Sequence, residues 1–189
     1  MQAAQTPEPR FLNGLPLDHL EQVPQSLRDA PETGLLTFET RTTWLGGFRS
    51  RTLVEGYEAG GQRIERRHAI DADEPAEVLG TDTAPNPQEL LFSAIGSCIS
   101  AVYAGHASLL GITLRSVRVE LRGTLDMRGV MLVADVPPGY PEVQCRVFVD
   151  ADATPEQVQA LHALALKASP NLYHLVRAIP TQMQLVIEG

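Results

Sequence analysis

The distribution of apolar and charged positions is most uneven around residues 87–111, the least polar part of the chain. After Glu89 no Asp, Glu, Lys or Arg occurs until Arg115. A stretch of this kind must be buried. A membrane span is the competing interpretation, and we disfavour it because the stretch is single and contains four Ser and one His. Nothing resembling a signal peptide opens the chain.

The ends and the composition of this stretch predict one long helix. Asn86 fits an N-cap, Pro87 fits the first helical position, and Gly111 fits a stop. Small residues would let another backbone approach closely, and larger apolar residues would supply packing volume. The small residues are Ser93, Ala94, Gly96, Ser97, Ser100, Ala101, Ala104, Gly105 and Ala107, and the larger ones are Leu90, Leu91, Ile95, Ile99, Val102, Leu109 and Leu110.

An alternation with a period of two predicts β-strands on both sides of this helix. The pairs Gly46–Gly47 and Gly60–Gly61 separate the first three strands and predict an antiparallel meander. The predicted strands are 36–44, 49–57, 63–70, 114–125, 143–149 and 182–187. The loop 71–86, rich in Pro and Gly, would lead from the meander into the long helix.

Helical spacing recurs in three further segments. Residues 18–29 carry apolar side chains at helical spacing, but Pro24 divides them into two pieces. Thr154 fits an N-cap, and Gln157, three residues later, can bond back to it, so a helix should begin there. A short helix follows at 170–176. The order of elements predicts an α+β fold, in which a curved antiparallel sheet packs on two central helices.

Length and charge narrow the class of protein. The 189 residues suffice for a single domain at 34–189, preceded by an N-terminal extension at 1–33 with a short helix. The formal net charge of -8 argues against a nucleic-acid partner. Only two cysteines occur, so we expect a cytoplasmic protein without a disulfide framework. Common motifs for zinc, dinucleotides and nucleoside triphosphates are missing, and we predict neither a metal nor a cofactor.

The segment PNPQELLFSAIGSC, the strand pair after it, and ALKASPNLYHLV with a final strand together resemble the OsmC/Ohr family of thiol-dependent peroxidases. The segment WLGGFRSRT and the loop containing DEP are also similar to that family. The resemblance covers most of residues 38–189. It implies an intertwined homodimer whose central helices pack together, an arrangement that the small residues of the long helix also favour.

The resemblance implies that Cys98 is the peroxidatic cysteine. Its thiolate would attack a peroxide oxygen, which releases an alcohol and leaves a sulfenic acid. This chemistry needs a thiol pKa below the free value of about 8.5, and Cys98 lies too far from the start of its helix for the helix dipole to help. A cation is needed instead. The resemblance makes Arg49 the first candidate and Arg51 the second.

Two positions depart from the family pattern. Where the two-cysteine peroxidases hold the arginine with a Glu, this chain has Gln88, and Glu89 follows one place later. Glu89 is therefore a candidate catalytic partner or simply a first-turn acid. Ser169 stands where those enzymes carry the resolving cysteine, and it cannot form a disulfide. Either an external thiol reduces the sulfenic acid, or Cys145 resolves it, or no peroxidase cycle exists.

Each candidate also has an ordinary structural interpretation. Cys98 could be a buried, inert core residue, and Cys145 alternates with three valines, so we expect it to pack in the core. The expected substrate pocket is apolar, consisting of Leu91, Phe92, Ile95 and Tyr103. The first functional hypothesis is a homodimeric peroxidase for organic hydroperoxides that uses an external thiol reductant. The second is a non-catalytic dimer that binds a small apolar ligand or serves as a stress-associated structural protein.

Overall fold

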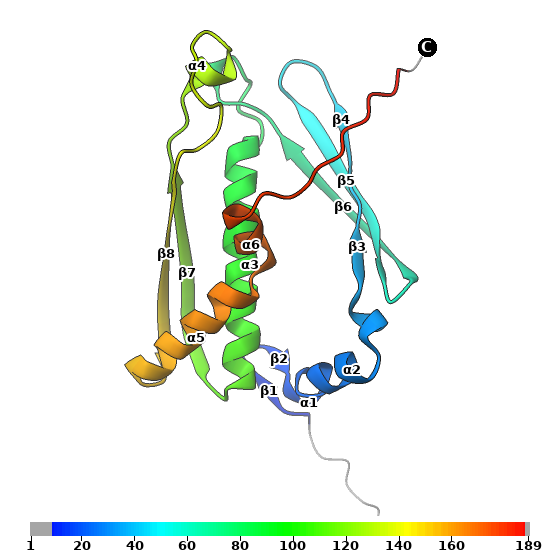
Figure 1. Cartoon of the computed structure of the whole chain (residues 1–189), viewed down its shortest axis with the longest axis vertical. Coiled ribbons are helices and arrows are strands. Elements are labelled where there is room, and N and C mark those ends of the chain that lie inside the picture. The colour runs from blue at the N-terminus through cyan, green and yellow to red at the C-terminus, as the bar shows by residue number, and fades with distance from the viewer. Residues whose placement is uncertain (1–8, 188–189) are drawn as a thin grey trace, which may run out of the picture. The chain divides into compact units, whose positions relative to one another are not determined.

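The computed structural model describes residues 9–187, and these divide into two compact units. The first unit contains residues 9–94 and 108–111, and the second contains residues 95–107 and 112–187. The long helix α3 (Pro87–Leu109), drawn in green in Figure 1, contributes residues to both units according to their bounds. Its predicted start is confirmed, since Pro87 is the first helical residue. All strand pairs are antiparallel, and the α+β class is confirmed.

The first unit is built on the predicted meander. Two long strands, β5 (Ser50–Ala59) and β6 (Gln62–Ala72), form a hairpin whose turn residues Gly60 and Gly61 have φ of 54° and 77°. These left-handed angles favour glycine. Two short strands, β3 (Leu36–Phe38) and β4 (Arg41–Trp44), pair with different parts of β5. The predicted first strand is therefore present in two pieces.

The N-terminal residues of the first unit form an arm beside the last turn of α3. The arm contains a tight hairpin, β1 (Phe11–Leu12) and β2 (Leu15–Pro16), then α1 (Leu17–Leu20), α2 (Val23–Asp29) and a 3-10 turn, Pro31–Gly34. The predicted two-piece helix is confirmed. Asn13 Nδ2 donates to Ser108 Oγ at 3.0 Å, and Ser108 Oγ donates to the carbonyl of Leu12 at 3.2 Å. These bonds attach the arm to α3.

The loop between β6 and α3 is organised by Asp73, which is 1% exposed. Its carboxylate accepts the hydroxyls of Thr81 and Thr83 at 2.5 and 2.8 Å, and the backbone N–H groups of Glu74, Thr81 and Thr83 at 2.8–3.2 Å. These hydrogen bonds lower the pKa of Asp73 well below its usual range. A Cβ at Gly80 would lie 1.7 Å from the carbonyl oxygen of Glu74, so this loop requires glycine there.

The second unit consists of a strand pair with helices. Strands β7 (Thr113–Gly123) and β8 (Val143–Asp152) pair along their whole length, and the short helix α4 (Met127–Val130) lies in their connection. Helix α5 (Pro155–Ala168) starts with the predicted capping box, and α6 (Pro170–Val176) follows directly (Figure 1). The core of this unit is formed by Ile95, Ile99, Tyr103, Ala107, Ile112, Leu161 and Ala165, each at most 4% exposed.

Helix α3 presents two different faces. Ile95, Ile99 and Tyr103 are buried, whereas the small residues Ser97 and Ala101 are exposed. Among the described residues, α3 is the one helix long and apolar enough to cross a membrane by length and composition. The core helix of a soluble protein satisfies the same criteria, and the expectation that α3 is not a membrane span stays a prediction.

Two features of the predicted sheet differ in the structure. The described strands are distributed over three separate sheets, two of which have only two strands. The predicted last strand at 182–187 is wrong for the chain as described, because this segment has no paired strand. A strand requires a neighbouring edge to receive its backbone hydrogen bonds. The apolar residues of the segment 182–187 are exposed. Met183, for example, is 95% exposed and Ile187 is 84% exposed.

Candidate active site

The candidate site centres on a contact between Cys98 and Ser169. Cys98 lies in the middle of α3 and is partly buried, and its Sγ is 3.4 Å from Ser169 Oγ. Ser169 is 1% exposed and joins α5 to α6. Its Oγ also accepts the backbone N–H of Leu172 at 3.3 Å, which makes Ser169 the N-cap of α6. The sequence break at Ser169–Pro170 therefore holds a hydroxyl against the thiol.

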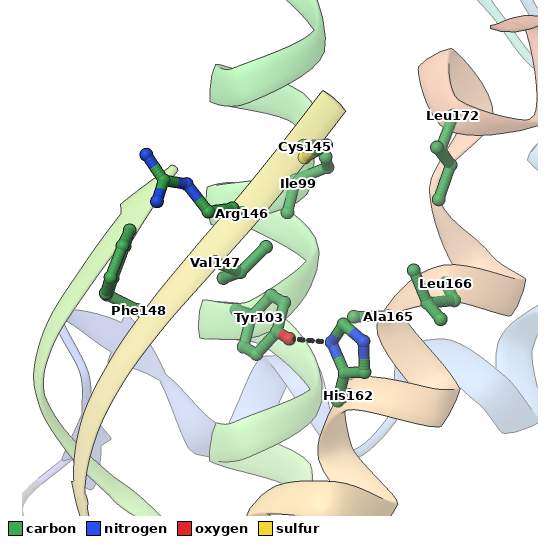
Figure 2. A pocket seen from close by; sticks show the side chains of 10 residues that line it. All are labelled: Ile99, Tyr103, Cys145, Arg146, Val147, Phe148, His162, Ala165, Leu166 and Leu172. Atoms are coloured by element: carbon green, nitrogen blue, oxygen red, sulfur yellow. Dashed lines mark hydrogen bonds between the residues drawn. The ribbon is translucent and has the colours of Figure 1, made fainter. Parts of the chain in front are cut away.

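A cavity of about 420 Å³ lies in the second unit, which also holds this contact (Figure 2). Two of its lining residues lie close to the contact in sequence: Ile99 follows Cys98, and Leu172 donates to Ser169. The lining comes from α3, β8, α5 and α6 and consists of Ile99, Tyr103, Cys145, Arg146, Val147, Phe148, His162, Ala165, Leu166 and Leu172. Cys98 itself does not line the cavity.

Tyr103 and His162 form a hydrogen-bonded pair in the lining of the cavity. Tyr103 is 1% exposed, and its hydroxyl is hydrogen-bonded to His162 Nδ1 (Figure 2). Burial, with a smaller contribution from Cys145, raises the pKa of Tyr103. His162 is not among the residues that the sequence predicts for the site. No local pattern marks His162, because its partner Tyr103 lies 59 residues earlier in the sequence, on a different helix.

Cys145 does not pack in the core as predicted. It is exposed and lines the cavity. The predicted side of the strand is correct, since Cys145 shares its face with Val147 and Val149, which are half-buried, whereas Arg146 and Phe148 on the other face are exposed. The helices leave a cavity over this part of β8 instead of covering it. Partial desolvation nevertheless raises the pKa of the Cys145 thiol.

Only one of the four expected pocket residues, Tyr103, lines this cavity. Ile95 is 2% exposed and packs in the core of the second unit. Leu91, which is 43% exposed, and Phe92 belong to the first unit. The expected pocket of Leu91, Phe92, Ile95 and Tyr103 is therefore not one surface within either unit.

The two candidate arginines differ in their partners. Arg51 Nε and Nη2 donate to the two carboxylate oxygens of Asp71 at 2.7 and 2.9 Å. Arg49 closes the turn after β4, where its backbone N–H donates to the carbonyl of Gly46 at 3.2 Å. Within residues 9–187 the Arg49 side chain has no ion pair or hydrogen bond. Arg49 is therefore the candidate whose guanidinium is not already committed to a carboxylate.

Glu89 caps its own helix. Its carboxylate accepts the backbone N–H of Asn86 at 2.8 Å, and the Asn86 side chain accepts the backbone N–H of Glu89 at 2.8 Å. This reciprocal pair is a capping box. Arg49, Arg51 and Glu89 belong to the first unit, whereas Cys98 belongs to the second. The meeting of Cys98 with a guanidinium stays a prediction.

Comparison with known proteins identifies the family. Residues 80–184, which include Cys98 and Ser169, match the family of OsmC-like proteins. The chain therefore belongs to the OsmC-like protein family, which includes organic hydroperoxide resistance proteins. None of the curated proteins matches the chain.

Solved structures support the fold. An OsmC-like protein from Mycoplasma pneumoniae is 14% identical, with a TM-score of 0.60 over 75% of this chain and 89% of its own. A putative osmotic stress induced and detoxification response protein from Psychrobacter arcticus is 17% identical, with a TM-score of 0.54 over 71% of this chain and 85% of its own. At these identities the similarity establishes the fold alone.

Proposed function

We propose that this chain is a thiol-dependent peroxidase that reduces organic hydroperoxides, with Cys98 as the peroxidatic residue. The contact between Cys98 Sγ and Ser169 Oγ at 3.4 Å carries this proposal. It joins the two positions to which the resemblance assigned the peroxidatic and the resolving cysteine.

The reaction follows from the residues at this contact. The Cys98 thiolate attacks the terminal peroxide oxygen of a hydroperoxide, the O–O bond breaks, and the protonated leaving group departs as an alcohol. Cys98 keeps the transferred oxygen as a sulfenic acid. Because Ser169 cannot form a disulfide, an external thiol condenses with the sulfenic acid and releases water. A second external thiol then cleaves the mixed disulfide and restores Cys98.

A homodimer is part of the proposal, because the chain leaves much apolar surface uncovered. The exposed side of α3 carries the small residues Ser93, Ala94, Ser97 and Ala101, which suit close packing of a second helix. Large side chains are also exposed in both units, including Phe38 at 68%, Trp44 at 73% and Met183 at 95%. Exposed apolar surface of this extent is typical of a protein that associates.

The second candidate is a non-catalytic dimer that binds a small apolar molecule. The cavity of about 420 Å³ favours it, because its volume is typical of ligand pockets and Cys98 does not line it. The two candidates make opposite predictions for turnover. A ligand-binding protein would not consume hydroperoxide in proportion to added thiol.

The test is consumption of cumene hydroperoxide with excess dithiothreitol. Wild type should turn over repeatedly, Cys98→Ser should show only the background rate, and Cys145→Ser should keep most of the activity. Cys145→Ser is the matched control, because it removes the second of only two cysteines by the same substitution. Equal consumption by wild type and Cys98→Ser would exclude the enzymatic proposal and leave the ligand-binding one.

A further inference from the structure

The Ser169 hydroxyl can form a hydrogen bond to the Cys98 sulfur, at the position where the two-cysteine peroxidases carry the resolving cysteine. Its hydroxyl has one proton to donate and two lone pairs to accept with. One lone pair accepts the backbone N–H of Leu172, and Cys98 Sγ is the second hydrogen-bond partner of the hydroxyl. Ser169 is 1% exposed, so solvent does not provide an alternative acceptor for its proton.

The ionisation of Cys98 decides the direction of the Cys98–Ser169 hydrogen bond. A thiolate has no proton and can only accept, so Ser169 must then be the donor. A hydrogen bond to a charged acceptor is stronger than one between neutral groups. The Leu172 N–H, donating to the same oxygen, makes the hydroxyl a better donor, because linked hydrogen bonds polarise one another. This arrangement favours the ionised sulfur over the thiol.

We propose that the Ser169 hydroxyl is a catalytic hydrogen-bond donor to the Cys98 sulfur and makes Cys98 a one-cysteine centre that requires an external thiol. This inference rests on the proposed function. With Ser169 in place, the sulfenic acid has a neighbouring hydroxyl that can bond to it but not condense with it. The oxidised sulfur therefore persists until a thiol from outside the chain arrives.

The first experiment measures alkylation of Cys98 by iodoacetamide, which requires no peroxide. All variants carry Cys145→Ser, so that Cys98 is the only thiol. Ser169→Ala should slow alkylation several-fold at pH 7, because the thiolate loses a charge-assisted bond, and this deficit should vanish at pH 10, well above the free cysteine value of about 8.5. Ser169→Thr keeps the hydroxyl and should restore the wild-type rate at both pH values.

A matched control separates this effect from loss of a helix cap. Thr154 caps α5 as Ser169 caps α6, but it lies at the opposite end of α5 from Ser169. Thr154→Ala should alkylate like the parent protein at both pH values. The proposal is overturned if Ser169→Ala alkylates like the parent, if it is slowed equally at pH 7 and pH 10, or if Thr154→Ala reproduces its effect.

The second experiment introduces the missing thiol with Ser169→Cys. Diamide couples neighbouring thiols without peroxidase chemistry. It should form a disulfide between Cys98 and the introduced cysteine, so that no free thiol is left and the mass of the intact protein falls by two hydrogen atoms. Failure of that reaction would overturn the geometry on which the hydrogen bond depends. Cumene hydroperoxide should give the same disulfide by condensation of the sulfenic acid with the new thiol and loss of water. A disulfide with diamide and no reaction with hydroperoxide would exclude the peroxidase while leaving the hydrogen bond in place.

Discussion

Arg51 and Asp71 face each other across β5 and β6 and are joined by two parallel hydrogen bonds of 2.7 and 2.9 Å. The guanidinium lowers the pKa of Asp71, and the carboxylate raises the pKa of Arg51. A guanidinium held in this way has a fixed orientation, and its charge is already balanced by the carboxylate. The Arg49 side chain, two residues earlier, has no such partner among residues 9–187.

This difference predicts that Arg49, and not Arg51, stabilises the negative charge on the Cys98 sulfur. Arg49→Ala should lower the rate of hydroperoxide reduction roughly 10–100-fold, because an unbalanced cation stabilises developing negative charge far more than a neutralised one. Arg49→Lys should recover part of the rate through its charge alone. Stopped-flow measurement of Cys98 oxidation tests both. The matched control is Arg51→Ala, and a larger loss in that variant than in Arg49→Ala would reverse the assignment.

Asp73 should make the stability of the protein depend on pH. The pKa of Asp73 is lowered in the folded state, so its contribution is fully present above the unfolded value of about 3.9 and is lost as the pH falls below it. Asp73→Asn should denature at a lower temperature than wild type at pH 7. The difference should shrink towards pH 3, as measured by circular dichroism.

The control for this prediction is Asp71→Asn, which removes an exposed carboxylate two residues before the buried one. Asp71 is 48% exposed at the side chain, so solvent screens its ion pair and the loss in stability should be small. A melting temperature of Asp73→Asn that differs from wild type by the same amount at pH 7 and pH 3 would contradict the role of the ionised carboxylate.

Leu161 tests how strongly the core of the second unit depends on α5. It is completely buried, so Leu161→Ala should lower the free energy of unfolding by about 2–5 kcal/mol. Leu164→Ala on the same helix is the matched control. Leu164 is 38% exposed, so this substitution should lower the free energy of unfolding clearly less than Leu161→Ala. Urea denaturation measures both. Similar losses would indicate that α5 does not bury the predicted face.

The exposed small residues of α3 should govern association. Ala101→Glu places a charge where close helix packing is proposed and should convert a dimer into a monomer in light scattering after size-exclusion chromatography. Ala160→Glu makes the same change at an exposed position of α5 and should leave the dimer intact. A wild-type protein that is monomeric, or an Ala101→Glu dimer of unchanged stability, would contradict the proposed interface.

The sequence predicts local structure well where one segment contains all the relevant information. The capping box of Thr154 and Gln157, the Gly60–Gly61 turn and the restart at Ser169–Pro170 each depend on neighbouring residues, and each is confirmed. The strand at 182–187 failed because strand formation depends on a separate edge that local alternation does not reveal.

The site was predicted less completely. Cys98 and Ser169 were both singled out, but 71 residues separate them, so their contact could not be derived from spacing. Cys145 was predicted on the correct face of its strand but was wrongly predicted to be buried in the core. Alternation identifies the face of a strand, but it does not show what covers that face. His162 was missed because its bond to Tyr103 depends on how α5 packs in the second unit.

The most direct test of the central claim is the site of oxidation by a single equivalent of hydroperoxide. Wild-type protein is mixed with cumene hydroperoxide in the presence of dimedone, and the tryptic peptides are analysed by mass spectrometry. The account predicts one dimedone adduct, on Cys98, with Cys145 still reduced. An adduct on Cys145 alone, or unmodified Cys98 after the hydroperoxide has been consumed, would contradict it.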